Sequence, residues 1–320
     1  MTGTVTGNGT RTSVGDQTTP RRGVLGPSSE ALSGDLIDTH AHFWDHREGS
    51  ITWAWLRRGR LHPVLGDIEA IKRKFYLPDD LVADARPMGL LAVVHVEATM
   101  GGCEPINETH WLERLAQESG HPGAIVASVK VRDTDLPQSL DAHLAASPAV
   151  RGVRDQLIEK PAFDRPFVRG LRELAKRDLL LEVAAHPHQL DELTAVADRV
   201  PDLTIVLEHA GRPAAVNYGE WSRGIASLAQ RDNVICKLSG LGLGDKTWDR
   251  IAIADRVARC IDAFGPERSM FGSNWPIDGL FTDYHTAVED IRSGLPAADV
   301  QQVFVETARK VYKLMLPRAS

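Results

Sequence analysis

Two histidines one residue apart stand at the end of the first apolar segment of the chain. Residues 35–46 read DLIDTHAHFWDH, so His40 and His42 closely follow Leu36 and Ile37. If this segment is a β-strand, its side chains alternate between two faces and both imidazoles point the same way. Two nitrogen donors that converge on one space favour a metal site or an acid/base site; chance polar residues at a loop mouth are the alternative.

Ionisable and amide side chains recur at the ends of seven further apolar segments. Such side chains normally avoid buried strands, so their repetition at one end of successive segments favours a single shared site. The residues concerned are His95 and Glu97, Lys130 and Arg132, Arg154, His186 and His188, Glu208 and His209, Lys237 and Ser239, and Asn274 with Asp278 just beyond it.

Two members of this set have the clearest chemical signature. Arg154 carries a planar guanidinium, which at a cavity mouth needs an anionic or carbonyl partner and suits a carboxylate. His209 ends a fully apolar segment in the sequence EHAG. His95 and Glu97 share one face and are compatible either with the site or with a hydrogen-bonded core, whereas His188 fits a helix cap better than a ligand.

Eight short apolar segments, most of them rich in Val, Ile and Leu, alternate with amphipathic ones. Buried parallel strands have this composition, and strands that alternate with helices form a parallel sheet. Eight units in roughly 280 residues predict a closed (β/α)8 TIM barrel rather than an open sheet, and no G-x-G-x-x-G turn supports dinucleotide binding. The predicted strands are residues 35–40, 90–98, 124–131, 150–154, 179–186, 203–211, 233–240 and 268–275.

One long connection and the N-terminal segment differ from this pattern. Residues 43–89 form an insertion after the first strand, which we expect to pack over the barrel mouth as a loop followed by a helix. Residues 1–34 are rich in Gly, Thr, Ser and Pro and have no apolar period, which predicts a flexible tail. Residues 35–320 are then expected to form a single domain.

Composition argues against several classes of protein. The net charge is −6, so nothing favours binding to nucleic acid. No apolar run reaches about 18 residues, which argues against a membrane span. Three dispersed cysteines fit a reducing compartment, and no apolar h-region follows Arg21 and Arg22, so we expect a cytoplasmic protein.

Several motifs occur together in a familiar order. DTHAHFWD, VVHVEA, RGVR, PHQL, LEHAGRP, KLSGL and MFGSNWPID follow one another along the chain. In this combination the sequence resembles the amidohydrolase superfamily, and within it the branch of sugar-acid lactonases and pyrone dicarboxylate lactonase. The resemblance covers roughly residues 35–316 and implies a distorted (β/α)8 barrel, the fold class that the segment count predicts independently.

The resemblance also implies roles for individual residues. The first-strand histidine pair of the family matches His40 and His42, its substrate-holding arginine matches Arg154, and its sixth-strand histidine matches His209. The eighth-strand aspartate, which accepts a proton from water in lactonases and ligates the metal in metal-dependent relatives, falls on Asn274. This is a departure, because an amide is a weak ligand and has no useful basicity.

We therefore expect hydrolysis of a small cyclic ester by activated water. The three histidines would stabilise the oxyanion, either directly or through one divalent ion, Zn²⁺ in the first instance, held by His40, His42 and His209; nothing indicates a binuclear site. Asp278 is the first candidate for the general base, with His186 and Glu97 behind it. The alternatives are a non-hydrolytic reaction such as decarboxylation, isomerisation or cyclisation, and a silent ligand-binding protein.

The substrate is expected to be a small acidic or polyhydroxylated molecule. Its predicted contacts are Arg154, Glu97 and Lys237, together with Trp44 and Trp275, whose rings, like those of Trp53 and Trp55, could stack on a sugar or lactone. Packing of the insertion onto the barrel is the alternative role for these tryptophans. The sequence leaves the oligomeric state open, and a homo-oligomer is compatible with it.

Overall fold

The computed structural model of the chain describes residues 1–4, 35–59, 61–62, 65–100, 103–155 and 164–315. The chain divides into two compact units, Met1–Leu32 and Ser33–Ser320. Residues 1–4 of the first unit are exposed and have no secondary structure. The rest of the predicted tail, residues 5–34, lies outside the described part of the chain.

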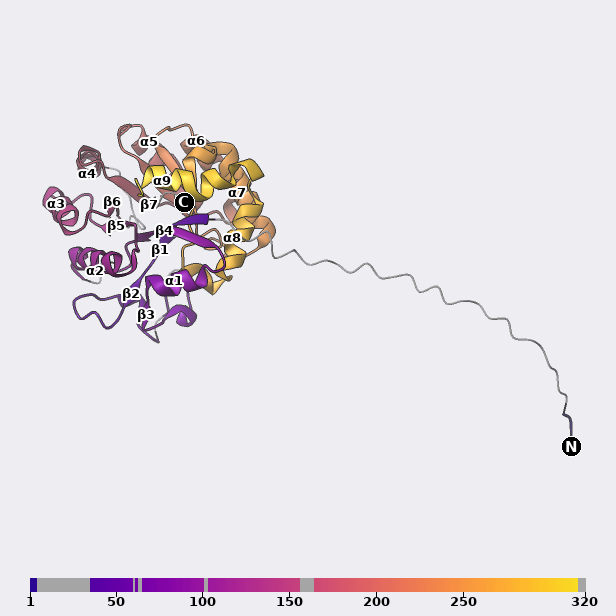
Figure 1. The fold of residues 1–320 in the computed structure, drawn as a ribbon. Helices are drawn as coiled ribbons and strands as arrows, with labels where there is room; N and C mark the ends of the chain where they lie inside the picture. Colours follow the sequence, from indigo (N-terminus) through magenta and orange to yellow (C-terminus); the bar gives the residue numbers. More distant parts are fainter. Residues whose placement is uncertain (5–34, 60, 63–64, 101–102, 156–163, 316–320) are drawn as a thin grey trace. The chain divides into compact units, whose positions relative to one another are not determined.

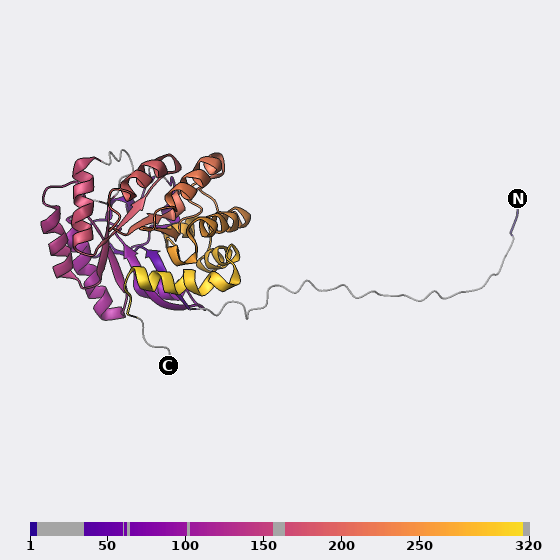
Figure 2. The same cartoon turned by 90° about the horizontal axis from the view of Figure 1, so that it is seen from above.

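The second unit is built around eight parallel strands in a single sheet, and the predicted (β/α)8 fold class is confirmed. The strand order is β1-β4-β5-β6-β7-β8-β9-β10, and a parallel bridge from Ala41 to Trp275 joins the two ends of the sheet. Helices surround the strands (Figures 1 and 2). The strands are β1 (Asp35–Ala41), β4 (Gly89–Val96), β5 (Ala124–Ser128), β6 (Val150–Arg154), β7 (Leu180–Ala184), β8 (Ile205–Glu208), β9 (Val234–Leu238) and β10 (Ser269–Phe271).

Six of the nine described helices begin where the sequence supplies a capping side chain or a proline. Asp164, Asp249 and Asp283 accept hydrogen bonds from the first-turn amides of α4, α7 and α8, and this satisfies amides that have no partner within the helix. Proline occupies the first turn of several others. The helices are α1 (Pro78–Asp84), α2 (Pro105–Ser119), α3 (Leu136–Ala146), α4 (Arg165–Lys176), α5 (Leu190–Ala197), α6 (Tyr218–Leu228), α7 (Arg250–Phe264), α8 (Tyr284–Ser293) and α9 (Thr307–Val311). None of the described helices is both long and apolar enough to span a bilayer.

The insertion between β1 and β4 packs onto the barrel through its aromatic residues. Its described residues contain the short antiparallel pair β2 (Trp44–Asp45) and β3 (Phe75–Tyr76), two 3-10 turns and α1. Trp44 and Trp53 are fully buried. The indole of Trp55 donates to the carbonyl of Ala98 at 2.7 Å, beyond the end of β4. The insertion is thereby fixed beside the carboxyl end of the sheet.

Six of the eight strands end two to four residues before the predicted segments do, and two of these, β8 and β10, end at the site. β8 stops at Glu208, and residues His209–Gly211 form a 3-10 turn in which His209 has a φ of 53°. β10 stops at Phe271, and Asn274 has a φ of 55°. Left-handed conformations of residues other than glycine cluster at functional sites.

Candidate active site

Three imidazoles meet where β1 and β8 end. The ring centroid of His40 lies 4.9 Å from that of His42 and 4.6 Å from that of His209. Both nitrogens of His40 are buried and have no hydrogen-bond partner among the described residues. A buried polar group without a partner is costly, so these nitrogens point to a ligand that the barrel is built to hold.

The other two histidines are oriented by hydrogen bonds through Nδ1. His42 Nδ1 donates to the carbonyl of Val96 at 2.8 Å, and His209 Nδ1 lies 3.0 Å from the hydroxyl of Ser239. Donation to a carbonyl fixes the tautomer of His42 and leaves a lone pair on its Nε2. Burial lowers the pKa of His42 to about 3 and the pKa values of His40 and His209 well below the usual 6.5, so all three rings are neutral near pH 7.

A buried guanidinium lies between two carboxylates beside the imidazoles. Arg154 Nη2 donates to Glu208 Oε2 at 2.6 Å, and its Nη1 donates to Glu97 Oε1 at 3.4 Å. Both glutamate side chains are fully buried. Burial by itself lowers the pKa of Arg154, but the two ion pairs outweigh it and the net shift is upward. Arg154 is therefore a fixed positive charge at the carboxyl end of β6.

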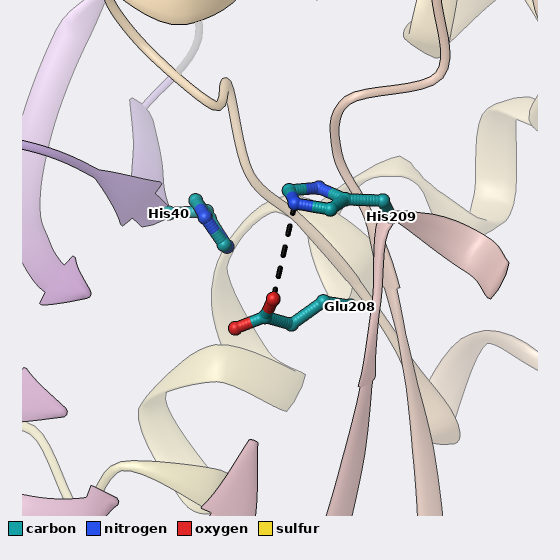
Figure 3. A group of neighbouring side chains, drawn as sticks. All are labelled: His40, Glu208 and His209. Atoms are coloured by element: carbon teal, nitrogen blue, oxygen red, sulfur yellow. Dashed lines mark ion pairs between the residues drawn. The ribbon is translucent and has the colours of Figure 1, made fainter. Parts of the chain in front are cut away.

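His40, Glu208 and His209 lie close enough together to offer three ligand atoms to one metal ion (Figure 3). One ligand atom from each lies within 4.8 Å of the others, and His209 Nε2 is 3.8 Å from Glu208 Oε2. Two imidazoles and a carboxylate are a donor set that divalent zinc accepts. The group differs from the predicted set of three histidines, because Glu208 takes the place of His42. Within the described part of the chain, Glu208 Oε1 and both nitrogens of His40 have no hydrogen-bond partner, which makes this set fit a divalent ion.

A cavity of about 700 Å³ opens next to these groups. Its positive charges outnumber its carboxylates: Arg154, Arg212 and Lys246 line it, against Glu97. Six of the predicted site residues line this cavity, namely His42, Glu97, Arg154, His186, His209 and Asn274. His40 lies buried behind this lining, in contact with His42 and His209.

Three predicted substrate contacts lie elsewhere, which is a correction to the sequence-based expectation. Lys237 is fully buried, and its Nζ donates to Glu182 at 2.5 Å and to the carbonyl of Thr39 at 2.8 Å. The indole of Trp44 donates to a backbone carbonyl of the insertion, and the indole of Trp275 donates to a carboxylate of α1. None of these three residues is in the cavity lining, so they hold the barrel and its insertion together.

Asp278, the predicted general base, lies behind Asn274 rather than in the cavity. Its Oδ1 accepts from Asn274 Nδ2 at 2.7 Å, and its side chain is buried. Burial raises the pKa of Asp278 to about 8, and the nearby Asp38 adds to the shift. Asn274 itself lines the cavity and separates Asp278 from it.

Sequence reasoning missed Arg212, and it included Glu208 in the predicted site without a specific chemical role. Arg212 lines the cavity, and its Nε has no hydrogen-bond partner in the part of the chain that the structure describes. Burial, and next the charge of Arg154, lower the pKa of Arg212. The position of Arg212 directly after His209-Ala210-Gly211 could have indicated a site residue. An arginine in a loop is usually solvated, however, so the sequence alone does not favour a site role. The sequence places Glu208 next to His209 at the end of one strand, which does not by itself predict a ligand.

A parallel barrel with imidazoles, carboxylates and a guanidinium at the carboxyl ends of its strands defines a (β/α)8 enzyme. The family model described as amidohydrolase matches residues 37–314. The chain therefore belongs to the amidohydrolase family, and it is an enzyme of the hydrolase type.

Individual relatives agree with this assignment. The uncharacterized protein y4mH of Sinorhizobium fredii is 32% identical over 296 residues, which cover 87% of this chain and 98% of the relative. An L-fucono-1,5-lactonase of Burkholderia multivorans is 30% identical over 304 residues, covering 88% and 97% of the two chains. A crystal structure of an amidohydrolase from Burkholderia multivorans with bound zinc superposes with a TM-score of 0.74 at 29% identity, covering 88% of this chain and 100% of the other.

Proposed function

We propose that the protein is a lactonase, which hydrolyses a small cyclic ester of a sugar acid or a similar acidic, polyhydroxylated molecule. The observation that carries the proposal is a cavity in which fixed guanidinium groups adjoin neutral imidazoles. The similarity to proteins named L-fucono-1,5-lactonase supports the same reaction. The volume of about 700 Å³ accommodates a ring of this size.

The positive charge of the cavity suits both the substrate and the transition state. Attack of water on an ester places negative charge on the carbonyl oxygen, and ring opening produces a carboxylate. Arg154 is held rigidly by Glu97 and Glu208, so it can donate to that oxygen without reorganisation. Arg212, whose Nε has no hydrogen-bond partner among the described residues, binds a carboxylate or hydroxyl of the ring.

The attacking water is held by His42. Its Nδ1 is committed to the carbonyl of Val96, so the Nε2 lone pair accepts a hydrogen bond from water in the cavity. A pKa of about 3 makes this imidazole a weak base. His40, Glu208 and His209 would hold a divalent ion, which would lower the pKa of a bound water to about 7 and so reduce the basicity that His42 must supply.

The test is a panel of sugar-acid lactones, including L-fucono-1,5-lactone, assayed by acid release and by product mass. We expect a product heavier than the substrate by one water. We expect kcat/KM to fall by about 10²-fold or more in His209→Ala, whereas His110→Ala, at an exposed histidine on α2, serves as the matched control and keeps the wild-type value.

Elemental analysis of the purified protein tests the ion separately. A metal content that falls in both His40→Ala and His209→Ala supports the ion site. Loss of carbon dioxide from the substrate would show a decarboxylase in the same pocket. Stabilisation by lactones without turnover would show a binding protein. Either result would contradict the proposal.

A further inference from the structure

Asn274 stands in a backbone segment that is fixed on both sides. The amide and hydroxyl of Ser273 donate to the carboxylate of Asp38 at 2.9 and 2.5 Å. The carbonyl of Trp275 accepts from the amide of His42 at 2.9 Å. These bonds tie the backbone around Asn274 to β1, which carries His40, and to His42, which directly follows β1. The orientation of the Asn274 amide is then decided by its own side-chain torsions.

Asp278 determines that orientation. Asn274 Nδ2 donates to Asp278 Oδ1 at 2.7 Å, and Asp278 N donates back to the carbonyl of Asn274 at 3.2 Å. Because the two branches of a planar amide point apart, Nδ2 at Asp278 leaves Oδ1 turned toward the cavity that Asn274 lines.

The carboxyl of Asp278 has little other use in the structure. It is 1% exposed, and its Oδ2 has no hydrogen-bond partner within the described residues. Its neighbour Ile277 belongs to a small apolar cluster with Ile68 and Ile71. An apolar side chain would fit such a place at lower cost, because burying a carboxyl group with one bond is unfavourable. The hydrogen bond that its carboxyl group accepts from the Asn274 amide accounts for an aspartate at position 278.

We propose that Asp278 is a positioning residue, which holds the Asn274 amide so that its Oδ1 accepts a hydrogen bond from the attacking water. Asn274 and Asp278 together then provide a hydrogen-bond acceptor for water at this strand end. In the lactonases that the sequence resembles, a single aspartate occupies this position. The amide oxygen aligns the water but takes no proton from it. The inference rests on the proposed hydrolysis for its kinetic part only.

Double-mutant kinetics on the most active lactone test the coupling. We expect Asn274→Ala and Asp278→Leu each to lower kcat by about tenfold with little change in KM, as the loss of one hydrogen bond predicts. The double variant should lose no more than either single variant, because both remove the same interaction. Asp278→Asn keeps an acceptor oxygen, so its kcat should be higher than that of Asp278→Leu and within about threefold of the wild-type value. Asp290→Leu, at a buried carboxylate of α8, is the control for lost stability without lost kcat.

The kinetic outcomes separate positioning from general-base catalysis. A loss of about 10²- to 10⁴-fold in Asp278→Asn would show that Asp278 takes the proton itself, and this would overturn the proposal. Multiplying losses in the double variant would overturn it as well, since they would show independent roles.

An NMR measurement on the full chain, labelled with ¹⁵N-asparagine, decides the orientation without any substrate. The Asn274 side-chain amide, assigned by its absence in Asn274→Ala, should have one slowly exchanging proton in the wild type and in Asp278→Asn, and none in Asp278→Leu. An unchanged signal in Asp278→Leu would refute the positioning role. If no lactone is turned over, the proposed function fails, and this measurement alone judges Asp278.

Discussion

Replacement of Lys237 by methionine separates a structural role from substrate binding. Lys237 lies in the barrel interior with both its side chain and that of Glu182 fully buried, and the two form an ion pair at 2.5 Å. Burial lowers the pKa of Lys237 and raises that of Glu182, and the ion pair opposes both shifts. In Lys237→Met the remaining partner of Glu182 is the hydroxyl of Tyr312, which donates at 2.6 Å.

The expected loss follows from the charge that is left behind. Removing one partner of a buried ion pair costs about 3–5 kcal/mol in the free energy of unfolding. The pKa of Glu182 then rises further, so the folded variant binds a proton that the unfolded chain releases above its usual pKa of about 4.3. The stability of the variant relative to wild type therefore falls as pH rises. We expect the deficit to be larger at pH 8 than at pH 5, because the raised pKa of Glu182 in the variant stabilises the folded state less as the pH rises.

Urea unfolding at pH 8 and pH 5 measures this deficit, and lactone kinetics give KM for the folded variant. Lys176→Met is the control, because Lys176 and Glu173 form an ion pair of 2.6 Å that is exposed to solvent, and its urea midpoint should scarcely change. The double variant Lys237→Met/Glu182→Leu should recover stability. A large rise in KM without a loss of stability would refute this reasoning and restore Lys237 as a substrate contact.

Further predictions concern the cavity. Arg212→Ala should raise KM for acidic lactones about tenfold or more with a smaller effect on kcat, as measured by initial rates; an unchanged KM would exclude contact with the substrate. Gly240→Ala should lower both the melting temperature and kcat, because Gly240 has a φ of 54° and a Cβ there would lie 2.5 Å from Nδ1 of His209. Since burial, followed by Arg154 and His95, lowers the pKa of His42 to about 3, this ring stays neutral as the pH falls. The pH profile of kcat/KM should then show no acid limb at about pH 6.5 from His42, and such a limb would indicate a solvated imidazole.

Patterns that are local in the chain could be predicted well. Each of the eight predicted apolar segments corresponds to one strand of the sheet, and each strand starts within two residues of the predicted start. The prediction succeeds because strands that are buried on both faces must be apolar. The alternation of strands and helices implied the barrel, and the barrel implied that His40, Arg154 and His209 converge. Strand ends were less accurate, since the turns at His209 and Asn274 depend on contacts with other strands.

The roles of individual polar residues could not be predicted in the same way. Lys237 and Arg154 both end strands in the sequence, yet Lys237 is enclosed by Glu182 and Tyr312 while Arg154 reaches the cavity. Trp44 and Trp55 belong to the same insertion, yet Trp55 lines the cavity whereas Trp44 is buried away from it. These differences depend on which side chain from a distant strand occupies the space next to each residue.

The amino-acid sequence by itself therefore determined the family, the barrel and the ring of polar strand ends, because periodicity and capping act over a few residues. Tertiary structure alone decided that Glu208 joins His40 and His209, that Arg212 enters the cavity, and that Asp278 lies behind Asn274. The burial of each ionisable group and the residue that it contacts determine its charge and the orientation of its side chain. Burial and contacts are properties of the packed barrel, not of the local sequence.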